Sequence, residues 1–389
     1  MNRNYKFGLL LLALLLLTGT LFADRETVWS DWVKFDQNKL ETWEISSEHG
    51  RMVSLRSKDR SNQENIRKIM VLFPKKSSAY DTAIDKILEV FESKGIQADF
   101  VLNNFVGNDE LGLEAVQYAE SNDVDLIYAM GSRSTAFAYK HYSGGSLPVV
   151  SVCAKDPVLL GQIKDYESGS DTNIAYTSLN VPIELQVKYL LELNPDLKNI
   201  VILYATQNTS AVATQVKPLI EISAQYGIAC TDLAVTNQQA AQIELERKVP
   251  ATVEKIRQID PNLSQTIFWI TGSTSVFREI ETINRYSDKI PVLSVVPDVV
   301  QSGDKSAVLS IGVGFESNAH LAALYGAGIL AGESRVGELK VGVVTPPDIA
   351  INFKKAKDIG LRIPFKFHKK PFRKQCVCLQ IVHVFGFPK

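Results

Sequence analysis

The sequence predicts an α/β protein built from two Rossmann-like, doubly wound lobes, because its middle part contains an internal repeat. Three landmarks recur in the same order, at offsets of 131 to 143 residues. With their second copies, they are residues 68–79 and 199–210, 127–134 and 268–275, and 148–153 and 291–296. A repeat of this length indicates two similar domains rather than a solenoid, whose units run about 20 to 50 residues. Two such lobes would face each other across a cleft.

Residues 1–23 have the pattern of a secretory signal peptide. Arg3 and Lys6 precede an apolar run over 7–17, and the small Ala23 stands at the expected cleavage site. The alternative is an uncleaved anchor, although the run is shorter than the roughly 20 residues that span a bilayer. We therefore expect a soluble protein in the periplasm.

Residues 24–66 form an N-terminal extension in which Trp29, Trp32, Phe35 and Trp43 alternate with polar residues. One interpretation is an aromatic hairpin packed on a lobe, and the other is a module that docks a partner. The first is favoured, because tryptophan more often fills a core than marks an interface.

The repeated region alternates strands with helices. A continuous apolar run over residues 69–73 is typical of a strand buried on both faces of a parallel sheet, and the helix that follows ends at Gly95. The expected strands are 69–73, 98–102, 125–130 and 147–152 in the first lobe, and 199–204, 229–234, 265–271 and 290–296 in the second. Strands separated by helices predict a doubly wound parallel sheet in each lobe.

Segments outside the repeat predict a hinge of several strands. We expect lobe 1 to comprise residues 67–175 and 316–345, and lobe 2 to comprise 176–315 and 346–364. The chain would then cross between the lobes more than once. Such crossings favour closure of one lobe onto the other over independent tumbling.

Composition argues for an ordinary globular protein, with 45% hydrophobic residues, 22% charged residues and a net charge of -1. This charge gives no indication of nucleic-acid binding. Cys153 and Cys230 fall in expected core strands, which favours buried free thiols, while Cys376 and Cys378 match no redox or zinc motif. Residues 365–389 carry six Lys or Arg and no acid, and form a basic tail of uncertain structure.

Loops after the expected strands supply the candidate ligand-binding residues. In open parallel sheets, ligands bind at the carboxyl ends of the strands, where helix N-termini present free N–H groups. Gly-Ser loops follow corresponding strands in both lobes and could receive a carboxylate. The candidates are Ser77, Ser78, Tyr80, Gly131, Ser132, Arg133, Ser134, Asp156, Thr206, Asn208, Gly272, Ser273, Thr274, Asp298 and Phe315.

Each candidate also has an ordinary structural interpretation. The serines and threonines could merely cap helices, and Arg133 could be a solvated surface residue. Asp156 could hold an ammonium group or cap the helix at Pro157, and Asp298 has the corresponding place in lobe 2. Tyr80 and Phe315 could be walls of the cleft or parts of the core.

Motifs for catalysis are missing from the sequence. It has no phosphate-binding Gly-x-x-x-x-Gly-Lys-Ser/Thr loop, no Gly-x-Ser-x-Gly elbow and no His-Glu-x-x-His helix, and its five histidines are dispersed. We therefore expect a binding protein rather than an enzyme, with no cofactor and no metal.

Several of these segments together resemble a known family. They are residues 148–158, 189–195, 199–204, 329–333, 351–361 and 363–364, which lie in the family's order and spacing. The chain resembles the substrate-binding proteins of ABC importers, in the branch associated with tryptophan or tyrosine. The resemblance implies a type I periplasmic binding protein fold and a monomer that passes a small solute, an amino acid or related carboxylate, to permease and ATPase subunits. The alternative is a periplasmic sensor that signals to a receptor or histidine kinase.

The sequence departs from this family in the cleft. Ser273 and Thr274 stand where the family tends to have Asp-Asn, and Phe315 replaces the usual aromatic residue with a ring that lacks a hydroxyl. These departures put an amine contact in lobe 2 in doubt.

Overall fold

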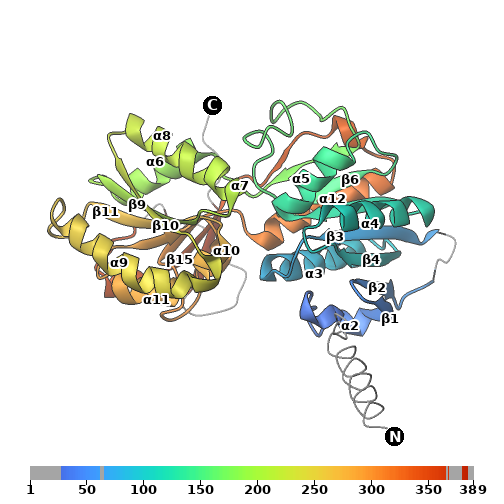
Figure 1. Ribbon diagram of the computed structural model, residues 1–389, viewed down its shortest axis with the longest axis horizontal. Helices are drawn as coiled ribbons and strands as arrows, with labels where there is room; N and C mark the ends of the chain where they lie inside the picture. The colour runs from blue at the N-terminus through green and yellow to red at the C-terminus, as the bar shows by residue number, and fades with distance from the viewer. Residues whose placement is uncertain (1–27, 62–64, 365–366, 368–378, 384–389) are drawn as a thin grey trace, which may run out of the picture.

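The protein is described by a computed structural model over residues 28–61, 65–364, 367 and 379–383. The expected signal peptide, Cys376 and Cys378 lie outside the described residues, as does most of the basic tail. Figure 1 shows two lobes side by side, each with a sheet covered by helices.

Each lobe contains a seven-stranded sheet in which five neighbouring strands are parallel and two antiparallel strands extend one edge. In lobe 1 the order is β1 (Trp43–His49), β2 (Met52–Ser57), β4 (Ala98–Asn104), β3 (Arg67–Phe73), β5 (Leu126–Met130), β6 (Val149–Val152) and β7 (Ile174–Ala175). In lobe 2 it is β10 (Ala229–Val235), β9 (Asn199–Ala205), β11 (Thr266–Ile270), β12 (Val292–Ser294), β13 (Leu309–Gly312), β15 (Asp348–Asn352) and β16 (Leu379–His383). All eight expected strands are present, and the predicted fold of two doubly wound lobes is confirmed.

Helices cover both faces of each sheet. Lobe 1 has α3 (Ser78–Ser93), α4 (Asp109–Ser121), α5 (Gly131–His141) and α12 (Phe315–Leu330). Lobe 2 has α6 (Ile183–Leu193), α7 (Thr209–Ala211), the π-helical turn η3 (Val212–Val216), α8 (Lys217–Gln225), α9 (Ala241–Arg257), α10 (Thr274–Phe277), α11 (Ile280–Tyr286) and α13 (Phe353–Asp358). Short helices η1 (Trp29–Asp31), α2 (Lys39–Thr42), η4 (Gln238–Ala240), η5 (Pro297–Val299) and η6 (Val336–Glu338) complete the set.

Alternation along β3 explains how lobe 1 is layered. Val71 and Phe73 pack in the cluster that includes α3 and α12, whereas Met70 and Leu72 pack in the cluster that includes α4 and α5. Successive side chains of a strand point to opposite faces, so a run that is apolar at every position needs helices on both sides.

The N-terminal extension packs on lobe 1 as an antiparallel hairpin. Strands β1 and β2 pair with each other, and β2 continues the sheet by pairing with β4. Trp32 and Trp43 are buried, and the Trp43 ring meets Phe100 edge-on at 5.4 Å between centroids. The core-filling interpretation of these tryptophans is confirmed.

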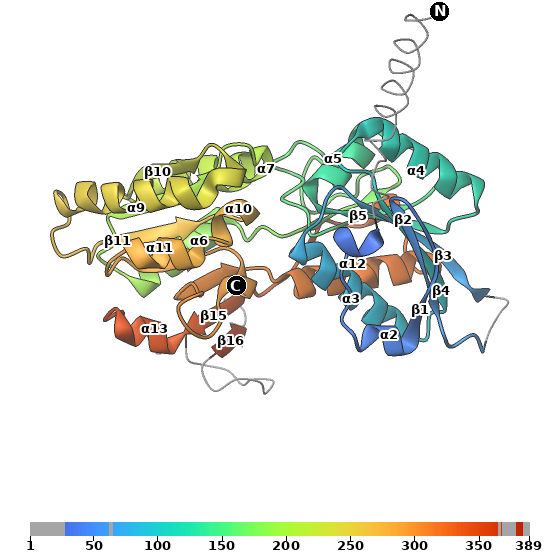
Figure 2. The ribbon, with the colours of Figure 1, turned by 60° about the horizontal axis from the view of Figure 1, so that its bottom comes forward.

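Lobe 2 extends its sheet at the other edge. Strand β15 pairs antiparallel with β13, and β16 pairs antiparallel with β15 (Figure 2). A described part of the basic tail is therefore a strand of the lobe 2 sheet. Phe367 is also buried in the lobe 2 core, beside Tyr189.

The chain crosses between the lobes three times. The first crossing follows β7 and includes β8 (Thr177–Ser178), which pairs with β14 (Gly342–Val343) of the third crossing. The second runs from β13 into α12, and α12 then packs against α3. These crossings form the expected hinge. No helix in the described part of the chain is long and apolar enough to cross a membrane.

The two cysteines of the described residues are both free thiols, but only Cys153 is buried. Cys230 is half-buried, which corrects the expectation of two buried thiols. Its strand, β10, lies at the edge of the lobe 2 sheet and is less fully covered than the central strands.

Candidate functional site

Two cavities lie where the lobes face each other. The hinge cavity has a volume of about 1230 Å³, and its lining includes Lys86, Asp298, His320 and Thr345. The strand-end cavity has a volume of about 720 Å³, and its lining includes Tyr80, Lys155, Gln215, Thr274 and Phe315.

The smaller, strand-end cavity is the better candidate for a ligand site. It is lined by residues that follow the carboxyl ends of eight parallel strands: β3, β5 and β6 of lobe 1, and β9, β10, β11, β12 and β13 of lobe 2. The hinge cavity instead collects residues after two strands of lobe 2, with helices α3 and α12 and the third crossing. Strand ends are where open parallel sheets bind ligands, and about 300 to 1,000 Å³ is the usual size of a small-molecule site.

The structure brings together about half of the sequence-predicted residues. Those that line the strand-end cavity are Ser77, Tyr80, Ser132, Arg133, Asn208, Gly272, Thr274 and Phe315. Ser78 and Asp298 line the hinge cavity, which Phe315 also borders. Gly131, Ser134, Asp156, Thr206 and Ser273 line neither cavity.

Hydroxyls outside the cavities serve the fold. The fully buried Ser134 donates its Oγ hydrogen to the Leu72 carbonyl at 3.0 Å, which ties α5 to the end of β3. Ser273 Oγ accepts from the Ala205 backbone N–H at 3.3 Å, and Thr206 Oγ1 donates to the Val235 carbonyl at 3.4 Å. These three residues form local structural hydrogen bonds and line neither cavity.

Gly131 acts through the space that it leaves free. It begins α5 with a φ of 73°, and a Cβ atom added there would lie 2.0 Å from the Tyr80 hydroxyl oxygen. Both the positive φ and the close approach require glycine. The Gly-Ser loop of lobe 1 therefore lets the Tyr80 ring reach the cavity.

Asp156 closes the turn over residues 157–161 that follows it in the chain. Its Oδ1 accepts from the backbone N–H groups of Val158 and Leu159, at 2.9 and 3.0 Å. Its other oxygen accepts from the Tyr166 hydroxyl, and the side chain is buried. The helix expected to begin at Pro157 is wrong, because residues 157–161 form a turn, and the Asp156 carboxylate closes this turn.

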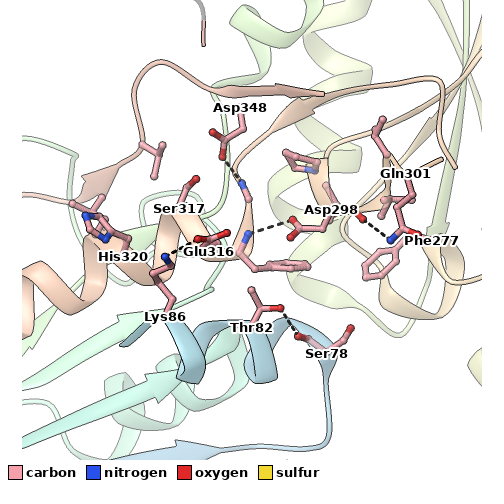
Figure 3. Close-up of a pocket in the computed structure, with 18 of the residues that line it drawn as sticks. Ser78, Thr82, Lys86, Phe277, Asp298, Gln301, Glu316, Ser317, His320 and Asp348 are labelled. Atoms are coloured by element: carbon pink, nitrogen blue, oxygen red, sulfur yellow. Dashed lines mark hydrogen bonds and ion pairs between the residues drawn. The ribbon is translucent and has the colours of Figure 1, made fainter. Parts of the chain in front are cut away.

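Asp298 belongs to the hinge cavity (Figure 3). Its carboxylate accepts from the Phe315 backbone N–H at 3.3 Å, while Asp348 accepts from Gly314 at 2.8 Å. Part of the Asp298 side chain reaches solvent, but the walls of the cavity reduce its hydration. This loss of hydration raises the pKa of Asp298, and the Asp348 and Glu316 carboxylates contribute further.

Arg133 reaches the strand-end cavity with its charge already paired. The guanidinium donates to the Gly107 carbonyl at 2.7 Å and forms an ion pair with Asp109. Hydrogen bonds from Arg133 and then from His141 hold the pKa of Asp109 below its usual value. Lys140 also lies near Asp109, at 3.9 Å between Nζ and Oδ2.

Lys155 is the charged residue that the sequence interpretation missed. Its backbone N–H donates to Ser132 Oγ at 2.9 Å, and the neighbouring Asp156 N–H donates to Asn180 Oδ1 at 3.2 Å. Leu179 N donates to the Ala154 carbonyl at 2.8 Å. The loop after β6 is thus fixed on both sides, so it holds Lys155 in a defined position.

The ammonium group of Lys155 is buried without a counter-ion. The residue is only 8% exposed, and among the described residues its ammonium has no ion pair or hydrogen bond. Burial lowers the pKa of Lys155 to about 8, because water no longer stabilises the charged form. Burial also raises the pKa of the nearby Cys153 thiol, which therefore remains neutral near neutral pH.

Lobe 2 faces this lysine with neutral hydrogen-bonding groups. Gln215, on the π-helical turn η3, accepts from the Gly272 backbone N–H at 2.9 Å. A Cβ atom added to Gly272 would lie 2.0 Å from Lys155 Nζ, so the ammonium of lobe 1 reaches the backbone of lobe 2. Asn208 donates to the Gly272 carbonyl at 3.4 Å and caps α7.

The remaining walls are largely apolar and aromatic. Tyr80, Phe277, Phe315 and Val313 line the cavity. Gln162 also lines it, and its buried amide oxygen has no hydrogen-bond partner among the residues that the structure describes. No group of three or more His, Cys, Asp or Glu side chains within the described ranges is arranged to hold a metal ion. The site therefore offers one buried cation, neutral amides and apolar walls to a small solute.

Known proteins share the sequence profile and the fold. Residues 68–375 match the family described as ABC transporter substrate binding protein. No curated protein matches the sequence. A conserved domain protein from Vibrio cholerae superposes with a TM-score of 0.60 at 20% identity, over 77% of this chain and 96% of that one.

Two further solved structures agree. The ligand-free, open form of a substrate-binding protein with adhesive properties from Clostridium difficile has a TM-score of 0.59 at 19% identity, and covers 77% of this chain and 96% of its own. An ABC domain from Streptococcus pneumonia in complex with L-Trp has a TM-score of 0.60 at 18% identity, with the same coverage. These likenesses support the type I periplasmic binding protein fold. The family match spans most of the sequence, and the chain belongs to the ABC transporter substrate-binding protein family.

Proposed function

We propose that this protein is the extracytoplasmic solute-binding component of an ABC importer. It captures a small solute, an amino acid or related carboxylate, in the strand-end cavity. The observation that carries the proposal is that the ends of eight strands, three from lobe 1 and five from lobe 2, line one cavity of about 720 Å³. The L-Trp complex of the pneumococcal relative adds an amino acid to the solutes to be tested.

Capture would proceed by closure of the lobes about the hinge. We take lobe 1 as residues 67–175 and 316–345, and lobe 2 as residues 176–315 and 346–364, so the three crossings lie between them. The proposed contacts are Ser77, Tyr80, Ser132, Arg133, Lys155, Asn208, Gln215, Gly272, Thr274 and Phe315. A solute touching both walls stabilises the closed state by its differential affinity for the two states.

The closed form would then present the solute to a membrane permease, and separate ATPase subunits would supply the energy. In this scheme the protein performs no chemistry, acts as a monomer and reaches the periplasm through the signal peptide at residues 1–23. The solute is the partner that the cavity itself addresses.

The test is to purify the exported protein gently, denature it and identify any released solute by mass spectrometry. A panel of amino acids, organic acids and sugars would be screened in parallel by thermal shift, followed by calorimetry and by small-angle scattering for closure. We expect at least one solute to bind at a single site and to compact the protein. A chain that releases no solute, and that no panel member stabilises or compacts, would contradict the proposed function.

A further inference from the structure

We propose that the strand-end cavity selects a small organic anion that carries no ammonium group, and that Lys155 is the residue that recognises its charge. This inference rests on the proposed solute-binding function and narrows its substrate class. It excludes zwitterionic amino acids as the preferred solutes.

Charge in the cavity has one sign. Among the described residues that line it, four are cationic (Lys75, Arg133, Lys140 and Lys155) and none is acidic. Arg133 and Lys140 lie beside the carboxylate of Asp109, which does not itself line the cavity. Lys75 is exposed to solvent. Lys155 is therefore the buried charge that remains without compensation.

A buried and unpaired ammonium group costs free energy unless a ligand supplies the opposite charge. An isolated charge moved out of water loses much of its solvation, and the usual remedy in proteins is a paired opposite charge. Lys155 Nζ and the neutral Gln215 amide of lobe 2 both lie beside Gly272, and no acidic residue of the described ranges lines this cavity. The anion that would complete the pair must then come from the solute.

An ammonium group on the solute would find no matching carboxylate. Asp156 accepts hydrogen bonds from two backbone N–H groups of its own loop and from the Tyr166 hydroxyl, and Asp298 accepts from Phe315 N in the hinge cavity. A second cation in the same cavity as Lys155 would instead be repelled. The cavity thus favours a carboxylate over the corresponding amino acid.

The other residues of the lining indicate the chemistry of the uncharged part of this anion. Tyr80, Phe277 and Phe315 offer rings, Val295 and Val313 offer aliphatic surface, and Gln215 offers an amide. An apolar or aromatic skeleton with a neutral oxygen substituent fits this set. Oxo acids, hydroxy acids and simple carboxylates belong to this class.

The experiment compares solutes that differ only at one carbon. Phenylpyruvate, 3-phenylpropionate and L-phenylalanine form an aromatic series, and 4-methyl-2-oxopentanoate with L-leucine forms an aliphatic pair. Affinities would be measured by calorimetry at pH 7 for the full chain and for K155M, K155R and K164M. Lys164 is an exposed lysine of the same lobe, outside both cavities, and K164M is therefore the matched control.

We expect at least one acid without an ammonium group to bind about tenfold or more tightly than its amino acid. K155M should weaken that binding by at least about thirtyfold, as expected for loss of a buried charge contact, with partial recovery in K155R and less than about threefold change in K164M. Circular dichroism and melting curves of the variants show whether each is folded.

Other results would overturn the inference. If amino acids bind more tightly than their acids, or if K155M keeps the full affinity, Lys155 does not select anions, while the solute-binding function stands. Co-purification of a solute that carries an ammonium group would also show that the cavity does not exclude amino acids. If none of these probes binds and no solute co-purifies, both the selectivity and the proposed function fail.

Discussion

The two lobes share a strand order but present different chemistry to the cleft. Lobe 1 contributes Lys75, Arg133, Lys140 and Lys155, whereas lobe 2 contributes amides, hydroxyls and the backbone of Gly272. The parallel strands run β4-β3-β5-β6-β7 in one lobe and β10-β9-β11-β12-β13 in the other, so each face is built from equivalent strand ends. In the proposed function, the different loops on this common framework assign charge recognition to lobe 1 and neutral hydrogen bonding to lobe 2.

The same division holds within the paired Gly-Ser loops. Ser132 accepts from Lys155 N and so positions the charged residue of lobe 1. Its counterpart Ser273 is buried and holds the end of β9. The serine of the Gly-Ser loop therefore positions Lys155 in lobe 1, whereas the equivalent serine in lobe 2 holds the end of a strand.

Replacing Lys155 by methionine tests the charged half of the comparison most severely. We expect loss of anion binding by at least about thirtyfold, together with a gain in stability of the ligand-free protein at pH 7. The gain follows because the pKa of Lys155 is lowered from 10.5 to about 8, which corresponds to a cost on the order of 3 kcal/mol for keeping it charged. Urea denaturation of both proteins measures it. A variant that is both less stable and still able to bind would show that Lys155 is a structural residue.

The pH dependence of binding gives the second largest effect. A carboxylate ligand stays ionised above pH 6, so affinity should be constant until Lys155 loses its proton. Because its pKa is about 8 in the free protein, affinity should fall above pH 8, by up to about tenfold per pH unit until the pKa of the complex is reached. The neutral Cys153 thiol beside it adds no anion at these pH values. Calorimetry from pH 6 to pH 10 measures this profile, and a flat profile would contradict the role of Lys155.

Stability of the free protein should change in the opposite direction. Between pH 8 and 10.5 the unfolded chain keeps the Lys155 proton more strongly than the folded chain does, so stability rises with pH in that window. Other groups titrate as well. The comparison is therefore made as the difference between the wild-type protein and K155M, which should shrink across the window.

Most of the fold follows from periodicity along the sequence. The continuous apolar run at residues 69–73, and the alternation of strands with helices after it, predicted all eight strands of the repeat. The pairing of β16 with β15 was not predictable, since residues 365–389 have a basic composition that is typical of no sheet. The π-helical turn that carries Gln215 has no sequence signature either.

The ligand site was less predictable than the fold, because the backbone conformation of Cys153 decides which side chain after β6 reaches the strand-end cavity. The residues after β6 are Ala154, Lys155 and Asp156, and the sequence interpretation chose the aspartate. Cys153 has a φ of 52°, so the chain turns sharply at the strand end, and Lys155 lines the cavity while Asp156 closes the following turn. A lysine directly after a buried strand was the available signal.

A methyl group at Gly272 tests the point where the two lobes meet. The added Cβ would lie 2.0 Å from Lys155 Nζ, so Gly272→Ala should displace the ammonium and weaken anion binding by about tenfold. The cost to the fold should be small, because the displaced atom is the end of a flexible side chain. In the K155M background the same substitution should have little effect on residual binding. Equal losses in both backgrounds would mean that Gly272 acts independently of Lys155.

The smallest expected effect on binding separates the two aspartates at matching positions. Asp156→Ala leaves two backbone N–H groups and the Tyr166 hydroxyl without their acceptor. Asp298→Ala leaves only the Phe315 backbone N–H without its acceptor. We expect the first to lower the free energy of unfolding by about 2 kcal/mol and the second by about 1 kcal/mol or less.

Neither substitution should change the affinity for an anion by more than about threefold, since neither carboxylate lines the strand-end cavity. Urea denaturation and calorimetry on the same samples measure both quantities. A loss of affinity of tenfold or more in Asp298→Ala, without a loss of stability, would place the solute across both cavities. Lobe 2 would then contribute a charge of its own, and the division of labour between the lobes would have to be abandoned.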